Sequence, residues 1–158
     1  MSSAVPREVA TSYLLWSAAI AAGIFDTVLS VVHAVSGDGS VHAGQLVLGV
    51  TLRIVAFLAL AYLVAQLWLG RRWSRYALAL VPGAFGVLAL TVGPATWLAG
   101  GGSVTAALTD ADVLALVIGA SRIMHVCAVL GAVVFMFLPA ANTWFRAPAA
   151  RPAPVLAR

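Results

Sequence analysis

Three charged side chains lie inside long apolar segments of this sequence, and they are Asp26, Arg53 and Arg122. In hydrocarbon such a side chain costs on the order of 3 kcal/mol at mid-helix, so it usually pairs with another or takes part in binding. Two arginines against one aspartate leave one positive charge without a partner. Because arginine keeps its proton, that charge needs water, a carboxylate of another protein, a lipid headgroup or an anionic ligand.

Counting along the chain places these three residues at one depth. Each lies nine or ten residues from one polar boundary of its apolar segment, and these boundaries are Ser36, Gly44 and Asp112, respectively. At a rise of about 1.5 Å per helical residue, all three lie roughly 14–15 Å below the same surface. We therefore predict that Asp26 contacts at least one of the two arginines directly.

Further polar residues are expected beside the three, because they recur at helical spacing from them or fall at the same depth. They are Ser30, His33, Thr91 and His125. Apart from His125, the polar residues lie toward one end of each segment, whereas the opposite ends are almost purely Ala, Leu, Val and Phe. This asymmetry predicts a polar cluster that opens toward one surface of the molecule.

Two interpretations of this cluster stay open at the level of sequence. In the structural one, Asp26 neutralises Arg53 or Arg122 and fixes how the helices pack, as buried ion pairs often do. In the functional one, these residues and His125 surround an anionic group. No cofactor is expected: His33 and His125 lie at depths of about 5 Å and about 20 Å, too different to share a haem. We find no phosphate-binding loop, HExxH or GxSxG motif.

The elements that carry these residues follow from hydropathy. Of the 158 residues, 63% are hydrophobic and 9% are charged, and the mean hydropathy is +1.04. A soluble domain is about a quarter charged, so a soluble enzyme, a nucleic-acid-binding module and a disordered chain are excluded. Four apolar stretches have about the 20 residues that cross a bilayer, and these are 11–35, 45–69, 76–98 and 113–138. With short connections, they predict an all-α polytopic membrane protein, an up-down bundle of four transmembrane helices.

The placement of arginine predicts the orientation in the membrane. All nine basic residues are arginines, and those outside the four segments lie on one side, whereas the other side carries aspartates. The positive-inside rule then puts residues 1–10 and the tail 139–158 in the cytoplasm, with the bundle in the cytoplasmic membrane. The Pro- and Ala-rich tail is expected to be disordered. The first segment loosely resembles a cleaved signal peptide, but its length and Asp26 favour a retained helix.

Aromatic and basic residues at the predicted cytoplasmic ends are typical of the membrane–water interface. We expect these side chains in the headgroup layer, with the guanidinium groups on anionic lipid phosphates. They are Arg71, Arg72, Trp73, Arg75, Trp144 and Arg146. Because the arginines border apolar segments, the high net positive charge indicates orientation in a membrane and not a nucleic-acid partner.

Three segments carry a resemblance to a known group of proteins, and they are PREVATSYLLW, LWLGRRWSRYALALVPG and VVFMFLPAANTWFR. With them the chain resembles uncharacterised small four-helix membrane proteins of high-GC bacteria. In that family a Pro and Trp pattern opens the first helix, an Arg-x-Trp-x-Arg loop follows the second, and Pro-Ala-Ala-Asn precedes an aromatic residue. Here these features correspond to Pro6 and Trp16, to 71–75 and to 139–145. The resemblance implies a cytoplasmic-membrane protein and brings no known activity and no catalytic residue.

Two functions are therefore expected. The first is a small non-enzymatic membrane protein that acts through lateral helix contacts, as an accessory or assembly partner or as a homo-oligomer. The alternative is a small transport or ligand-binding bundle with an outward-facing polar cavity for an anionic group. For both functions we expect contact with the lipid bilayer and its anionic headgroups. The first function also requires a partner, either another membrane protein or a second copy of this chain.

Overall fold

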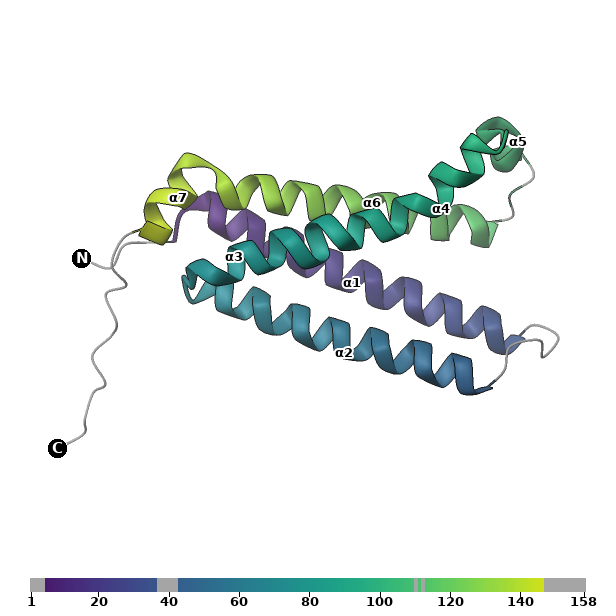
Figure 1. The fold of residues 1–158 in the computed structure, drawn as a ribbon, viewed down its shortest axis with the longest axis horizontal. Helices are drawn as coiled ribbons and strands as arrows, with labels where there is room; N and C mark the ends of the chain where they lie inside the picture. The colour runs from purple at the N-terminus through teal and green to yellow at the C-terminus, as the bar shows by residue number, and fades with distance from the viewer. Residues whose placement is uncertain (1–4, 37–42, 110, 112, 147–158) are drawn as a thin grey trace.

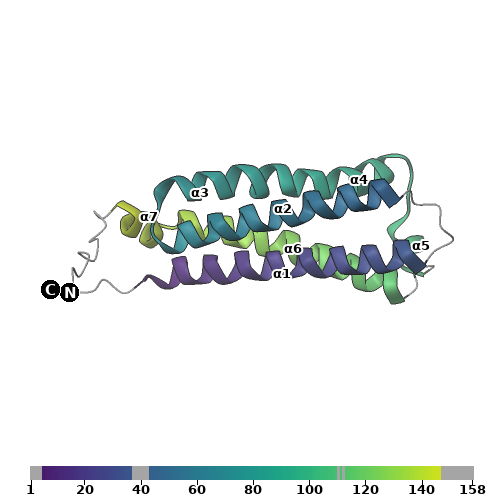
Figure 2. The same cartoon turned by 90° about the horizontal axis from the view of Figure 1, so that it is seen from below.

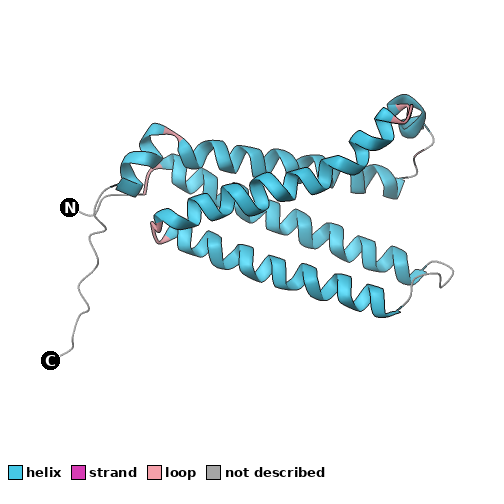
Figure 3. Cartoon of the chain, viewed as in Figure 1, coloured by secondary structure: helices cyan, strands magenta, loops and turns pink. Residues whose placement is uncertain are grey.

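The fold is helical throughout the part of the chain that the structure describes. The computed structural model describes residues 5–36, 43–109, 111 and 113–146. Among these residues it contains no strand (Figure 3), which confirms the all-α prediction. The helices, drawn in Figure 1, are α1 (Arg7–Ser36), α2 (Ala43–Trp68), α3 (Arg72–Leu78), η1 (Ala79–Gly86), α4 (Val87–Ala99), α5 (Val104–Thr109), α6 (Val113–Phe137) and α7 (Pro139–Arg146).

Within these described residues, four helical stretches are long and apolar enough to cross a membrane. They contain between 25 and 28 residues, and they are Arg7–Val32, Gly44–Trp68, Arg72–Ala99 and Val113–Phe137. The third begins at Arg72, earlier than predicted, because the turn before it is short. Gly70 ends α2 with a φ of 73°, a left-handed conformation that glycine adopts without steric cost, and the chain returns to helix within two residues.

The third stretch consists of α3, η1 and α4 joined end to end, and two prolines shape it. Proline lacks the N–H that bonds four residues back, and its ring collides with that carbonyl. Around Pro82 the helix widens into the eight-residue π-helical segment η1. Pro94 lies inside α4, and Figure 1 shows the end of α4 diverging from the bundle toward α5. None of the residues of α4, before or after Pro94, is buried.

The apolar core lies at the end of the bundle that carries α3 and α7. The most extensive helix–helix contact is between α1 and α6, which lie side by side in Figure 2. Small residues let the two backbones approach, and the hydroxyl of Ser12 donates a 2.9 Å hydrogen bond across the contact to the carbonyl of Ala132. The largest fully buried apolar side chains are Val9, Trp16, Leu67, Leu78, Val129 and Met136. Toward α5 fewer side chains are buried.

The tail begins with a helix that the sequence analysis does not anticipate. The prediction of disorder from residue 139 onward is wrong for its first eight residues, which form α7. Ala141 and Phe145, one helical turn apart, are both buried in the core. So short a helix is unstable alone, and tertiary packing on one face is what stabilises it. Residues 147–158, the rest of the predicted tail, lie outside the described part of the chain.

Candidate functional site

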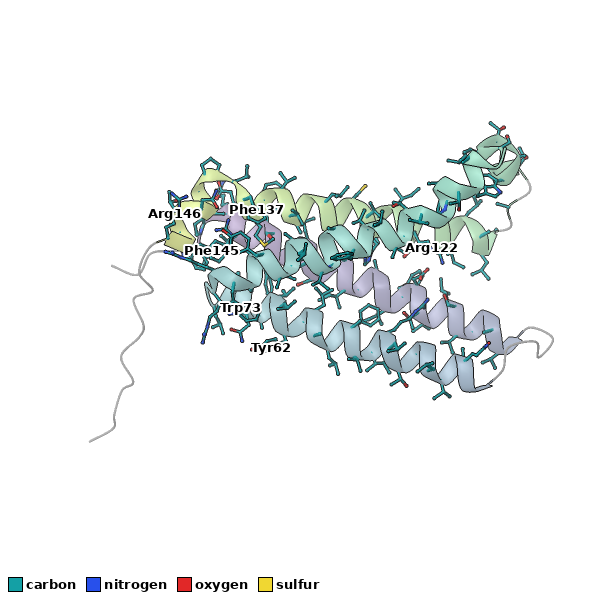
Figure 4. The ribbon with its side chains drawn as sticks, viewed as in Figure 1. Tyr62, Trp73, Arg122, Phe137, Phe145 and Arg146 are labelled. Atoms are coloured by element: carbon teal, nitrogen blue, oxygen red, sulfur yellow. The ribbon has the colours of Figure 1, made fainter. Side chains whose placement is uncertain are left out.

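An ion pair joins α1 to α6 in the half of the bundle away from the apolar core. The Nε atom of Arg122 lies 3.5 Å from Oδ1 of Asp26, which confirms the prediction that Asp26 contacts an arginine. Figure 4 shows Arg122 well separated along the bundle from Trp73 and Arg146. The distance is too long for a good hydrogen bond, and Oδ1 is buried without a hydrogen-bond partner in the described structure. The pair is therefore held by charge alone.

This ion pair lines a cavity of about 160 Å³ to which all four long helical stretches contribute. The lining residues are Ala22, Gly23, Asp26 and Thr27 of α1, Arg53 and Phe57 of α2, Leu90 of α4, and Ser121, Arg122 and His125 of α6. The cavity thus collects the three charged residues that the depth count places together. It lies within the stretches long enough to cross a membrane, where an unpaired charge is expensive.

Arg53 is the cation of the cavity that lacks a counter-charge. Its Nη1 donates a long hydrogen bond of 3.4 Å to Oγ1 of Thr27, whose own hydroxyl donates to the carbonyl of Gly23. Among the described residues, no carboxylate lies within ion-pair distance of Arg53. Since Asp26 is paired with Arg122, the lining carries one net positive charge, and that charge belongs to the Arg53 guanidinium.

His125 and Ser121 supply the neutral polar groups of the wall. Nδ1 of His125 lies 2.9 Å from the carbonyl oxygen of Ala19. Because a carbonyl only accepts, Nδ1 carries the proton in this contact, and the neutral ring keeps Nε2 as an acceptor. Ser121 is buried, and its Oγ has no hydrogen-bond partner in the described part of the chain. Ser121 is not among the predicted site residues, although its i, i+4 spacing from His125 puts both on one face of α6.

A second cleft, of about 210 Å³, lies nearer the beginning of α2. It shares Arg53 with the cavity and is also lined by Ser30, Gln45 and Gly49. The Ser30 hydroxyl donates a 2.7 Å hydrogen bond to the Asp26 carbonyl, so this predicted residue lies beside the cavity and not in it. A side-chain Cβ at Gly49 would meet no atom within 4 Å. The polar side chains of this cleft, Ser30, Gln45 and Arg53, stand beside the apolar residues Val31, Leu46 and Val50.

Of the two other predicted members of the cluster, one does not line the cavity and the other has a side chain outside the described residues. Thr91 is exposed, its hydroxyl donates to the carbonyl of Val87, and Leu90 takes the position in the lining. Thr91 lies next to Leu90 in the chain and so at nearly the same level along the bundle as the cavity. Successive residues are rotated by about 100° around a helix, so the level alone does not determine which side chain faces the cavity. The side chain of His33 lies outside the described part of the structure.

Arg75, one of the arginines at the α7 end of the bundle, does not lie where the sequence predicts it. Arg75 was expected on lipid headgroups, but its side chain is buried, with 5% of its surface exposed. The guanidinium carbon lies 4.7 Å from the ring centroid of Phe137 and 4.6 Å from that of Phe145, and Nη2 donates to Oδ1 of Asn142. Planar, delocalised charge packs on aromatic faces at low desolvation cost, so Arg75 ties α3 to α6 and α7.

The other predicted interface residues lie nearer the surface. Arg72 donates from Nε to the carbonyl of Phe145 and from Nη2 to that of Arg146, at 2.6 Å for the second bond. These carbonyl groups belong to the last two residues of α7, and a cation at the C-terminal end of a helix is stabilised by the helix dipole. Arg71, Trp73 and Arg146 are exposed, and Trp144 is half-buried over Gly70. Contact of these groups with lipid headgroups stays a prediction.

The arrangement of the cavity is suited to holding an anion. It presents one uncompensated guanidinium, a second guanidinium that is paired with a carboxylate, and a buried hydroxyl. Comparison of the chain with known protein families, with curated protein sequences and with solved structures found no match. A function for the chain therefore has to follow from the chemistry of these residues.

Proposed function

We propose that this chain is a small, non-enzymatic, multi-pass protein of the cytoplasmic membrane that binds a small anion in the cavity around Arg53 and Arg122. The observation that carries the proposal is the unpaired guanidinium of Arg53, which lines a cavity within the membrane-spanning stretches. Within a stretch that crosses a membrane, a cation without a counter-charge is costly, and arginine cannot lose its proton to escape that cost. An anion that enters the cavity neutralises the site.

The proposed topology gives this anion a direction of access. We place the helices as an up-down bundle with both termini in the cytoplasm, because the exposed residues Arg71 and Arg146 lie at the end of the bundle that carries α3 and α7. The second cleft, with Ser30, Gln45 and Gly49, then leads from the outer surface to Arg53. The anion reaches the site from the outside, and the apolar core at the cytoplasmic end closes the way through.

A second candidate is lateral assembly with another membrane protein or a second copy. The observation in its favour is that α4 buries none of its residues, and that an apolar groove of about 620 Å³ runs between α4 and α6. Native mass measurement of the purified complex separates the candidates. A stable complex with a different protein supports assembly, whereas the chain alone with a retained small molecule supports the anion site.

The topology is tested with single cysteines in a Cys127→Ala background, since Cys127 is exposed. Ser103→Cys is expected to react with a membrane-impermeant maleimide in intact cells, and Thr143→Cys only after lysis, because both positions are exposed in the structure. Ser40, also predicted outside, lies beyond the described residues, and Ser74 is buried and would be protected in either orientation. Reaction of Thr143→Cys in intact cells would reverse the proposed orientation.

The anion site is tested by titrating the purified protein with propionate in a calorimeter. We expect Arg53→Leu to weaken propionate binding at least about tenfold, since a hydrogen bond to a charged group contributes roughly 1.5–3 kcal/mol. Arg71→Leu is the matched control: it removes an exposed arginine at the other end of the molecule and should leave the affinity unchanged. Equal binding by Arg53→Leu and the unmodified protein would exclude this site.

A further inference from the structure

We propose that the bound anion carries one negative charge and its own O–H group, and that this hydroxyl donates a hydrogen bond to Asp26. The inference rests on the proposed anion site and specifies its ligand class: small hydroxylated monoanions such as a hydroxycarboxylate. It follows from two buried polar atoms that the surrounding protein leaves unsatisfied, from the charge of the lining and from the size of the cavity.

The first unsatisfied atom is Oδ1 of Asp26. It is buried, and no donor in the described structure forms a hydrogen bond with it. The 3.5 Å contact with Nε of Arg122 supplies charge but is longer than a normal hydrogen bond. An ionised carboxylate has no proton to donate and only accepts, and a buried acceptor without a donor is costly. A donor that reaches Asp26 from the cavity would satisfy this acceptor, and a simple carboxylate ion brings no such donor.

The second unsatisfied atom is Oγ of Ser121, which lines the same cavity. Ser121 is deeply buried, with 7% of its surface exposed, and its hydroxyl has a proton to donate. Together with the guanidinium groups of Arg53 and Arg122, it provides the donors that the oxygens of an anion accept. The wall thus offers several donors and, in Asp26, an acceptor, which matches a ligand that is both an acceptor and a donor.

The charge of the lining selects among such ligands. Arg53 and Arg122 against Asp26 leave one positive charge, so a monoanion with a neutral hydroxyl brings the site to zero. A zwitterionic amino acid, whose ammonium group is also a donor, would leave the surplus charge in place. The volume of about 160 Å³ corresponds to roughly five water molecules at about 30 Å³ each, so the cavity has room for a small ligand. A molecule of three carbons with a carboxylate is of this size.

The test compares three probes of nearly equal size in calorimetric titrations of the purified full-length protein. Propionate supplies the carboxylate alone, lactate adds a hydroxyl to it, and alanine adds an ammonium group instead. We expect lactate to bind about tenfold more tightly than propionate, the gain from one hydrogen bond to a charged acceptor. Alanine should bind more weakly than lactate.

Variants tie this preference to Asp26. In Asp26→Ala the preference for lactate over propionate should disappear, whereas Ser121→Ala should weaken both probes by a similar factor and keep the preference. Thr91→Val is the matched control, because it removes a hydroxyl of α4 that does not line the cavity, and it should change neither affinity. If Asp26→Ala does not fold, the comparison of probes on the unmodified protein and on Ser121→Ala still decides the question.

The outcomes separate the two proposals. Equal affinities for lactate and propionate, or tighter binding of alanine than of lactate, would overturn the hydroxylated monoanion while leaving an anion site in place. Unchanged lactate preference in a folded Asp26→Ala variant would also overturn it. Absence of binding for all three probes would show that water fills the cavity, and both this inference and the proposed function would fall.

Discussion

Replacing Asp26 by alanine is expected to lower the free energy of unfolding by about 3 kcal/mol, and replacing Arg122 by leucine in addition is expected to recover at least half of that loss. Removing one partner of a buried ion pair leaves the other charge uncompensated, which typically costs about 3–5 kcal/mol, whereas removing both can be nearly neutral. The lower value applies here because the Arg122 side chain is 53% exposed.

The structure also predicts which arginine must be replaced to restore stability to Asp26→Ala. Arg122 contacts Asp26 at 3.5 Å, whereas Arg53 bonds only to Thr27 among the described residues. Asp26→Ala combined with Arg53→Leu should therefore recover less than the combination with Arg122→Leu. The measurement is a double-mutant cycle from reversible unfolding in mixed micelles. Double variants no more stable than Asp26→Ala would show that the ion pair does not hold α1 to α6.

Glu8→Ala is the control for this cycle. Glu8 is the other carboxylate of α1, in its first turn, and it does not line the cavity. Its removal costs only the favourable interaction of a negative charge with the helix N-terminus, less than about 1 kcal/mol. A loss for Glu8→Ala as large as that for Asp26→Ala would attribute both effects to the charge of α1 and not to the cavity.

Replacing Arg75 by alanine is expected to lower the free energy of unfolding by about 3 kcal/mol, although the residue belongs to a cluster typical of a membrane surface. The substitution removes the stem that packs in the core, the contacts with the rings of Phe137 and Phe145, and the donor to Asn142. A desolvated cation–π contact contributes about 2 kcal/mol, and an unpaired buried carbonyl oxygen costs about 1–3 kcal/mol. Chemical unfolding followed by tryptophan fluorescence measures the loss.

Two matched variants identify the cause. Arg71→Ala removes an exposed arginine four residues away and should cost no more than about 0.5 kcal/mol. Arg75→Lys keeps the charge but not the planar group, so it should lose more stability than Arg71→Ala and less than Arg75→Ala. If Arg71→Ala and Arg75→Ala were equally mild, both side chains would act at the lipid surface, as the sequence pattern predicts, and the buried contact would be without effect.

The sequence alone was sufficient for the four long helical stretches and for the common level of the charged residues along them. Apolar stretches of about 20 residues in a chain with so little charge have few alternatives to helices, because only helices satisfy every backbone group without water. The constant rise of a helix then places Asp26, Arg53 and Arg122 at one level by counting. The contact between Asp26 and an arginine follows from that level and from the cost of an unpaired charge in an apolar segment.

Only the tertiary structure decided which side of each helix faces its neighbours. Rotation about the helix axis depends on packing, which is why Leu90 and Ser121 line the cavity and Thr91 does not. It also decided that Arg122, and not Arg53, pairs with Asp26. At the other end, the burial of Arg75 depends on α7, and α7 is stable only because Ala141 and Phe145 find a core to enter. A local pattern of basic and aromatic residues does not distinguish an arginine on a lipid surface from an arginine in such a core. The burial of Arg75 depends on contacts with residues about 70 positions away in the chain, which the local pattern does not contain.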